Sequence, residues 1–278
     1  MNMKLNQKMF FDFNFRNLGL TLILTVGCFV LTYVVSKYWP SLSNSIAVGI
    51  IIFFMSLVYL RGSIYQARLK YKIDLNEARL KLGNLGSTVP LPWSNYSTSP
   101  ITICDLIENA LEPDTGNIIE CGTGISTLYL SSIIKNKGDG HLYSIEDDQK
   151  WANMVSAYLK QLNLSNYCTI IVAPLKYIEV DGIETEWYDT SQFELDIPEE
   201  SCGLLYVDGP KWGNKNNPRR YPVLSIFKKY LKSGSKVFLD DADKDESLII
   251  HQKWEHLYKL KRQKNIIYKD RHRKWIFN

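Results

Sequence analysis

The feature that most constrains the fold of this chain is the stretch from Asn117 to Asp148. It begins with a short apolar run, Asn117–Cys121, which has the size and composition of a buried parallel strand. A glycine turn follows at Gly122–Gly124, then a run with helical apolar spacing, Ile125–Ile134, and then a second strand-like run that ends at Glu146. Strand, glycine turn, helix, strand and terminal acid is the plan of a nucleoside-binding βαβ unit. The stretch therefore predicts an α/β domain.

The glycine turn differs from the dinucleotide-binding fingerprint. That fingerprint requires a third glycine, whereas Ser126 and Thr127 follow Gly124 here, and the acid Glu120 stands just before the first glycine. The string from Glu120 to Thr127 instead resembles motif I of the class I S-adenosylmethionine-dependent methyltransferases. The resemblance spans about residues 90–278 and continues in chain order through Tyr143–Asp148, Ala173–Leu175, Trp187–Asp189, Val207–Pro210, Arg220–Pro222 and Leu239–Ala242.

The resemblance implies a fold and a cofactor. The expected fold is a Rossmann-like, doubly wound, mostly parallel seven-stranded sheet that ends in an antiparallel hairpin, over residues 264–269 and 273–278. The expected cofactor is S-adenosylmethionine, with its methionine part over the glycine turn and its ribose hydroxyls on Glu146. Glu120 would contact the amino-acid end of the cofactor or, alternatively, cap backbone amides of the turn. The implied cofactor-binding residues are Glu120, Gly122, Thr123, Gly124, Ser126, Thr127, Glu146, Asp147 and Asp208.

A second group of acids stands at the ends of two strands predicted later in the chain. Carboxyl ends of parallel strands meet at one sheet edge, so we expect Asp208, Asp240 and Asp241 to lie close together. They look like the divalent-metal site of the catechol-type and macrolide-sugar O-methyltransferases. Three carboxylates supply the oxygen ligands that Mg²⁺ prefers. The catechol-type enzymes carry asparagine where Asp241 stands. The alternative is metal-free catalysis, with Asp208 or Asp241 as the general base.

The remaining charged and aromatic segments allow two interpretations. Lys211, Arg219 and Arg220 could bind an acidic substrate, or they could pair with the acids of residues 174–198. We expect that segment to be a long loop that faces the substrate. The histidines show no metal-ligand spacing, and His251 and His256 are expected on a helix surface.

Two uncharged apolar runs, residues 18–36 and 46–60, precede this domain on either side of Pro40. Each approaches the roughly 20 residues that a membrane-spanning helix needs. Basic residues flank the outer ends of both runs, so the positive-inside rule places both termini in the cytoplasm. We expect an anchor over residues 1–63 with two transmembrane helices at about 18–38 and 44–60, a linker helix over 64–89, and a methyltransferase domain over 90–278. A buried helical hairpin and a single span with a re-entrant helix are the alternatives.

Composition excludes some functions. The net charge of +4 gives no argument for nucleic acid, and the five cysteines, an odd number without a Cys-x-x-Cys pair, suit reduced thiols. The predicted function is methyl transfer, to a hydroxyl oxygen of a small-molecule, glycan or lipid-linked acceptor. The alternatives are a non-catalytic membrane scaffold that keeps the nucleoside-binding fold and an NAD-type oxidoreductase, against which the missing third glycine argues.

Overall fold

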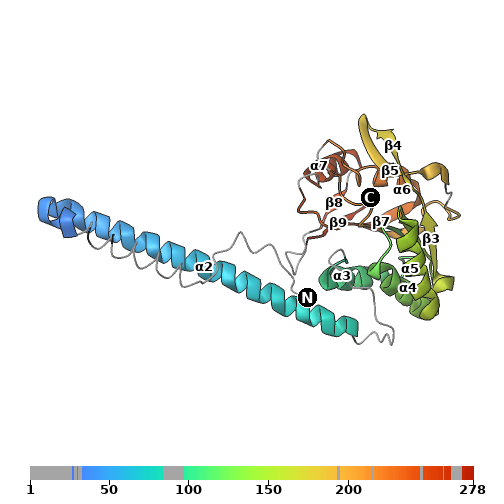
Figure 1. Ribbon diagram of the computed structural model, residues 1–278, viewed down its shortest axis with the longest axis horizontal. Helices are drawn as coiled ribbons and strands as arrows, with labels where there is room; N and C mark the ends of the chain where they lie inside the picture. The colour runs from blue at the N-terminus through green and yellow to red at the C-terminus, as the bar shows by residue number, and fades with distance from the viewer. Residues whose placement is uncertain are drawn as a thin grey trace. The chain divides into compact units, whose positions relative to one another are not determined.

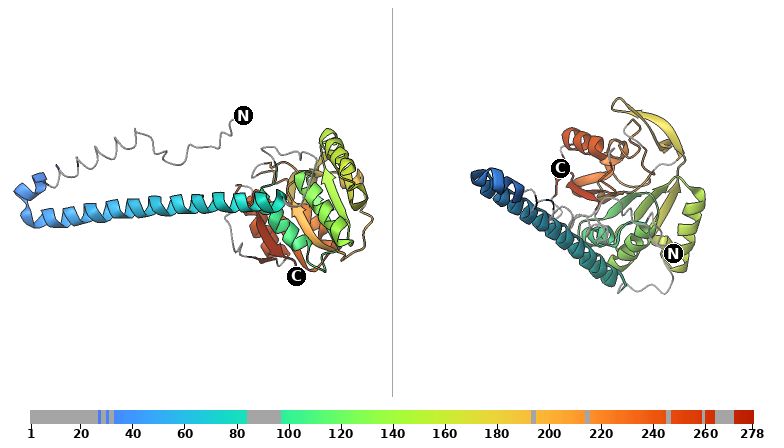
Figure 2. Two further views of the ribbon diagram at one scale, coloured as in Figure 1. Left: turned by 90° about the horizontal axis from the view of Figure 1, so that it is seen from below. Right: turned by 60° about the vertical axis from the view of Figure 1, so that its left-hand side comes forward.

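The computed structural model describes residues 27, 30, 33–83, 97–192, 195–213, 216–244, 247–258, 260–263 and 271–278 (Figures 1 and 2). The chain divides into two compact units, Met1–Lys70 and Tyr71–Asn278. Most of the first predicted membrane span lies outside the described residues.

The N-terminal unit is helical where it is described. Residues 33–38 are helical, the helix is interrupted at Trp39, and α2 then runs from Pro40 to Gly83. The second predicted span and the predicted linker are therefore parts of one helix. Within α2, Ile46–Gly83 is long and apolar enough to span a membrane, and its apolar window is not buried. The described residues contain one such helix, so two spans are not shown.

A seven-stranded sheet forms the centre of the second unit, with strand order β3-β2-β1-β6-β7-β9-β8. The strands are β1 (Asn117–Cys121), β2 (Leu142–Glu146), β3 (Cys168–Val172), β6 (Cys202–Val207), β7 (Leu231–Leu239), β8 (Lys261–Arg262) and β9 (Arg273–Ile276). The first five run parallel to one another, and β9 pairs antiparallel with β7 and β8. The predicted Rossmann-like, mostly parallel seven-stranded sheet with antiparallel C-terminal strands is thus confirmed, whereas the transmembrane hairpin predicted to precede it is not shown. Strand order reverses beside β1, where ligands bind in open α/β sheets.

Helices cover both faces of the sheet. They are α3 (Pro100–Ala110), α4 (Ile125–Lys137), α5 (Gln149–Gln161), α6 (Val223–Phe227) and α7 (Ser247–Leu257), with short 3₁₀ turns at Ser165–Tyr167, Thr190–Gln192 and Lys228–Tyr230. Successive β1 side chains point to opposite faces, so Ile118 joins a core cluster with residues of α3, α4 and α5, and Ile119 joins one with residues of α6 and α7. The C-terminal end of α2 reaches the first cluster through Leu82.

The prediction of a long loop over residues 174–198 is wrong. Its first half is an antiparallel hairpin, β4 (Leu175–Val180) and β5 (Ile183–Tyr188). Asp181 and Gly182 make the turn, both with positive φ, as a two-residue hairpin loop requires. Trp187 and Tyr188 end β5 fully buried in the core, so they do not face a substrate.

Three smaller expectations also need correction. The final hairpin uses β8 and β9, whose paired residues are 261–262 and 275–276, and residues 264–270 lie outside the described part. The sequence also predicts a helix over residues 219–231, but α6 covers only Val223–Phe227, because a 3₁₀ turn over Lys228–Tyr230 follows it and β7 begins at Leu231. His251 is buried against Trp275, whereas His256 is exposed as expected.

Candidate active site

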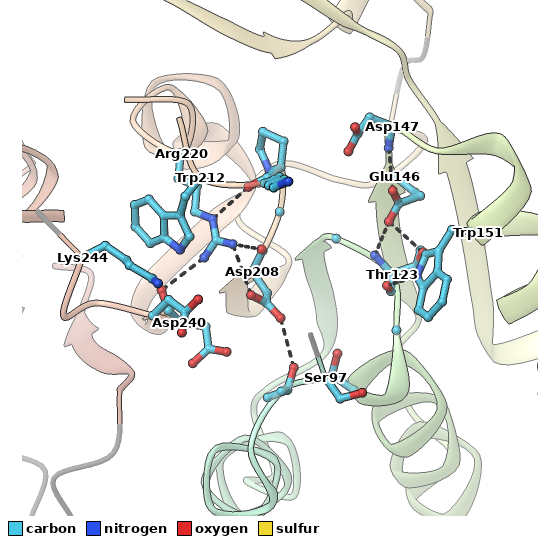
Figure 3. Close-up of a pocket in the computed structure, with 18 of the residues that line it drawn as sticks. Ser97, Thr123, Glu146, Asp147, Trp151, Asp208, Trp212, Arg220, Asp240 and Lys244 are labelled. Atoms are coloured by element: carbon cyan, nitrogen blue, oxygen red, sulfur yellow. Dashed lines mark hydrogen bonds and ion pairs between the residues drawn. The ribbon is translucent and has the colours of Figure 1, made fainter. Parts of the chain in front are cut away.

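A cavity of about 1510 Å³ opens at the carboxyl ends of β1, β2, β6 and β7 (Figure 3). It brings together most residues that the sequence singled out. The predicted site residues that line it are Gly122, Thr123, Gly124, Ser126, Glu146, Asp147, Asp208, Asp240 and Asp241. Glu120 and Thr127 were predicted to bind cofactor, but they do not line this cavity.

The glycine turn after β1 forms part of the cavity wall. Gly122 has a φ of +92°, and a Cβ there would come within 2.8 Å of the backbone nitrogen of Gly209, which follows β6. Glycine is therefore required for both conformation and space. A Cβ at Gly124 would meet no protein atom within 4 Å. The wall is thus open at Gly124, where a ligand can approach the backbone.

Glu146, at the end of β2, holds this turn. One carboxylate oxygen accepts bonds from the backbone N–H and the hydroxyl of Thr123, both at 2.9 Å. The other accepts from the backbone N–H groups of Asp147 and Asp148, both at 3.0 Å. Burial raises the pKa of Glu146, and these hydrogen bonds oppose the rise. Because a carboxylate has about four acceptor positions, a ribose hydroxyl would have to displace a weaker partner, such as the Thr123 hydroxyl.

Trp151, in the first turn of α5, is a cavity residue that the motifs of the sequence did not predict. Its indole Nε1 donates to the carbonyl oxygen of Thr123 at 2.7 Å. In Figure 3 its ring stands on the Glu146 side of the cavity. The signal in the sequence was its place one turn after the acid of β2. Trp151 therefore holds the glycine turn in place through the carbonyl group of Thr123.

Glu120 has a structural role in the core and does not face the cavity. Its carboxylate is fully buried and accepts three hydroxyl bonds of 2.6 Å, from Ser126, Thr127 and Ser144. Thr127 in turn accepts a bond from the backbone N–H of Gly124 at 2.8 Å. Burial raises the pKa of Glu120 to about 7, although the hydroxyls oppose the rise. Glu120 thus ties β1 to β2 and to the first turn of α4, and it caps no backbone amide of the turn.

The acids that follow β6 and β7 line the opposite end of the cavity. Asp208 accepts a bond from the Thr98 hydroxyl at 3.2 Å, and Asp240 accepts one from Tyr206 at 3.4 Å. Burial raises the pKa of Asp208. Burial, reinforced by the charges of Asp208 and Asp241, raises the pKa of Asp240 to about 8. The expected proximity of the three acids is therefore present in the structure.

Arg220 lies among these acids, and its side chain is almost completely buried. Its Nε donates to the carbonyl oxygen of Pro210 at 3.0 Å, and one terminal nitrogen donates to that of Asp240 at 3.1 Å. The other terminal nitrogen contacts both the carbonyl and the carboxylate of Asp208. Trp212 stacks on the guanidinium, 4.2 Å from the ring centroid. Arg219, by contrast, pairs with Glu186 of β5, which was one of the two sequence expectations for these basic residues.

The metal prediction gains no support from the donor groups. Within the described ranges, no group of three His, Cys, Asp or Glu side chains is arranged to hold a metal ion. Each predicted ligand already has a protein partner: Arg220 and Thr98 on Asp208, Tyr206 on Asp240, and Arg271 on Asp241 at 2.9 Å. These residues do not fit a Mg²⁺ site as they stand.

Comparison with known proteins adds an independent observation. Residues 119–242 match a family model described as a methyltransferase domain. No curated protein matches this chain. A Staphylococcus aureus structure provisionally described as a caffeoyl-CoA O-methyltransferase shares 14% identity with a TM-score of 0.51, over 75% of this chain and 98% of that chain. An O-methyltransferase from Bacillus cereus, solved with SAH, shares 16% identity with a TM-score of 0.47, over 73% and 90% of the two chains.

SAH-bound methyltransferase PaMTH1 from Podospora anserina shares 12% identity with a TM-score of 0.49, over 80% of this chain and 95% of that chain. At these identities the likeness to the solved structures is one of fold. The sheet order and the glycine turn after β1 give a Rossmann-like α/β fold, and residues 119–242 match a methyltransferase domain. The family match over residues 119–242 thus makes this chain a methyltransferase.

Proposed function

We propose that this chain transfers the methyl group of S-adenosylmethionine to a hydroxyl oxygen of a small-molecule, glycan or lipid-linked acceptor. One observation carries the proposal: a single cavity joins the open glycine turn at β1 to the buried acids at the ends of β6 and β7. The end at the glycine turn can bind a nucleoside cofactor. The end at the buried acids can bind an acceptor hydroxyl that loses its proton. Because both ends share one cavity, the two reactants can meet in line.

The cofactor end is the part from the glycine turn to Trp151. Gly122–Gly124 would lie against the methionine part, with Gly124 leaving the space that a side chain would fill. Glu146 or its neighbour Asp147 would accept the ribose hydroxyls, since both line the cavity on this side. The cofactor supplies a methyl group activated by a positively charged sulfur. The acids here offset that charge.

Asp208 is the proposed general base. In the transfer step, the acceptor oxygen forms a bond to the methyl carbon, and the sulfur–methyl bond breaks with its electron pair going to sulfur. The acceptor proton passes to a carboxylate oxygen of Asp208. Burial raises the pKa of this carboxyl, which favours proton uptake. Asp241 is the second candidate, but its carboxylate pairs with Arg271 at 2.9 Å, more closely than Asp208 pairs with Arg220 at 3.3 Å.

Two measurements test this function. Calorimetric titration with S-adenosylmethionine, SAH and NAD separates a methyltransferase from an NAD-type enzyme. Methyl transfer from labelled cofactor into cell extracts of small molecules, glycans and lipids, with mass spectrometry of the products, identifies the acceptor atom. We expect a methyl ether, and Asp208→Asn should lower turnover at least a hundredfold with little change in cofactor affinity. Cofactor binding without any methyl transfer would favour the scaffold alternative.

We also propose that the N-terminal unit attaches the chain to a bilayer. The apolar part of α2 is exposed, and Tyr38, Trp39 and Tyr59 stand near its ends, where aromatic side chains suit the membrane interface. Arg61 and Arg68 follow it. The expected arrangement has two spans and a cytoplasmic catalytic domain.

Chemical labelling tests the arrangement. A cysteine placed at Ser43 should react with an impermeant maleimide from outside the cell, above the background of the chain without this substitution. Full-length protein should resist extraction from membranes by alkaline carbonate. Labelling of Ser43→Cys only from the cytoplasmic side would contradict the two-span topology. Release by carbonate would contradict membrane insertion altogether.

A further inference from the structure

The acids at the ends of β6 and β7 raise the question of what balances their charge. Asp208, Asp240 and Asp241 line one part of the cavity, and Asp240 is nearly buried. Three carboxylates at one sheet edge repel each other unless a cation compensates them. In an enzyme that needs a divalent ion, the ion itself would supply that charge.

In this chain the compensating positive charge comes from a side chain, that of Arg220. The Arg220 guanidinium is 3% exposed and reaches across both strand ends, with carbonyl contacts at Pro210, Asp208 and Asp240. It also contacts the Asp208 carboxylate at 3.3 Å. A buried guanidinium held by this many acceptors has little freedom to leave, since each broken bond would leave a buried group unpaired. Trp212 closes one face of the guanidinium plane.

Figure 3 shows the same arrangement, with Arg220 between the Asp208 and Asp240 ends and the Trp212 ring beside it. Arg271 gives a second positive charge, because its guanidinium pairs with Asp241 at 2.9 Å. Two of the three predicted metal ligands are thus in ion pairs with arginines. The third, Asp240, has its backbone carbonyl bonded to Arg220 and its carboxylate bonded to Tyr206.

We propose that Arg220 is the resident cation of the acceptor end of this cavity and takes the place of a divalent metal, so that methyl transfer by this chain is metal-independent. The inference rests on the proposed position of the acceptor beside Asp208. In this arrangement Arg220 is a positioning residue: it holds Asp208 in place and offsets the charge of the acid cluster, while Asp208 takes the proton.

Manganese binding tests the proposal directly. Mn²⁺ replaces Mg²⁺ at oxygen sites and is detected by electron paramagnetic resonance. The full chain in detergent, saturated with S-adenosylmethionine, should show no stoichiometric Mn²⁺ site with a dissociation constant below about 1 mM. One tight Mn²⁺ per chain in the wild type, lost in Asp240→Asn, would overturn the proposal.

Variants at Arg220 separate charge from hydrogen bonding. Arg220→Gln removes the charge and should bind Mn²⁺ at least tenfold more tightly than the wild type. Arg220→Lys keeps the charge and should bind Mn²⁺ as weakly as the wild type. Arg219→Gln is the matched control, since neither Arg219 nor its partner Glu186 lines the cavity, and it should not change Mn²⁺ binding. Equal Mn²⁺ affinity in folded Arg220→Gln and wild type would contradict the proposal.

The wild-type measurement remains decisive if the Arg220 variants do not fold. Cofactor titration in the same samples keeps the two hypotheses apart. Failure to bind S-adenosylmethionine counts against the proposed function, whereas a tight wild-type Mn²⁺ site counts only against metal independence. Turnover on any identified acceptor should survive treatment with EDTA.

Discussion

Glycine has two different uses in the turn after β1. At Gly122 the backbone conformation and the nearby Gly209 both exclude a side chain, whereas at Gly124 there is open space beside the cavity. The sequence alone predicted the turn but could not separate the two positions. The difference depends on β6, which is distant in sequence and parallel to β1.

The first prediction follows from this difference. Gly124→Val should fold normally, because a Cβ at this position meets no protein atom within 4 Å, and should weaken S-adenosylmethionine binding at least tenfold, about 1.4 kcal/mol. Gly122→Ala should instead lower the melting temperature, since its Cβ would clash with the backbone of Gly209. Thermal unfolding and calorimetric titration measure the two effects. Unchanged cofactor affinity in folded Gly124→Val would contradict the placement.

Glu120 shows what sequence reasoning could not foresee at this scale. Motif resemblance assigned it to the cofactor, but strand alternation turns its carboxylate toward α4, on the same face as Ile118. The hydroxyls of Ser126 and Thr127 at the start of α4 were the available signal. Three hydroxyl donors satisfy a buried acid whose charge would otherwise be costly.

The second prediction concerns pH. The pKa of Glu120 is about 7 in the folded chain, above its ordinary value of 4.5, so the folded state holds this proton more tightly than the unfolded state. Its contribution to stability is full below about pH 4.5 and is lost as pH rises to about 7. In Glu120→Gln, urea unfolding should show a weaker fall in stability across this window than in the wild type. The exposed Glu199→Gln should behave like the wild type.

The hairpin of β4 and β5 is the main element that the sequence analysis missed. Asp181–Gly182 between two runs of β-branched and aromatic residues is a strong hairpin signal, but the acids of the segment suggested a loop. Three hydroxyls, from Tyr221, Ser225 and Tyr258, bond to Asp181 and fix the turn. The parallel strands were predictable because each is a short, buried apolar run between turn signals.

The hairpin also supports the loop that carries Trp212. The side-chain oxygen of Asn217 accepts bonds from the Thr185 hydroxyl at 2.6 Å and the backbone N–H of Glu186 at 2.9 Å. The third prediction is that Asn217→Ala lowers stability by about 1–3 kcal/mol, because a partly buried N–H loses its acceptor. Hydrogen exchange at Glu186 should accelerate in this variant. Asn217→Asp keeps the accepting oxygen and should retain slow exchange at that amide.

At the scale of the whole molecule, α2 contributes to both units. Its apolar N-terminal part is exposed, whereas Ala78 and Leu82 near its end are buried, and Leu82 packs with the core of the catalytic unit. The length of α2 was not predictable from hydropathy, because the apolar run ends at Leu60 while helix-forming residues continue to Gly83.

The fourth prediction compares two deletions. A chain that begins at Tyr71 should be soluble and bind S-adenosylmethionine like the full chain in detergent, because it keeps Ala78 and Leu82. A chain that begins at Asn84 should be less stable by roughly 2–4 kcal/mol, since burial of those side chains is lost. Urea unfolding compares the two. Equal stability would show that the end of α2 does not belong to the catalytic unit.

The close approach of Gly122 and Gly209 restricts how this enzyme could be redesigned. A Cβ at Gly209 would lie 2.7 Å from the Cα of Gly122, and one at Gly122 would lie 2.8 Å from the nitrogen of Gly209. Neither position can be enlarged, even as a compensating pair, because each contact is with backbone atoms. A mutant library selected for new acceptors should therefore leave these positions as glycine. Its accepted substitutions should fall on wall residues such as Lys211, Trp212 and Lys244.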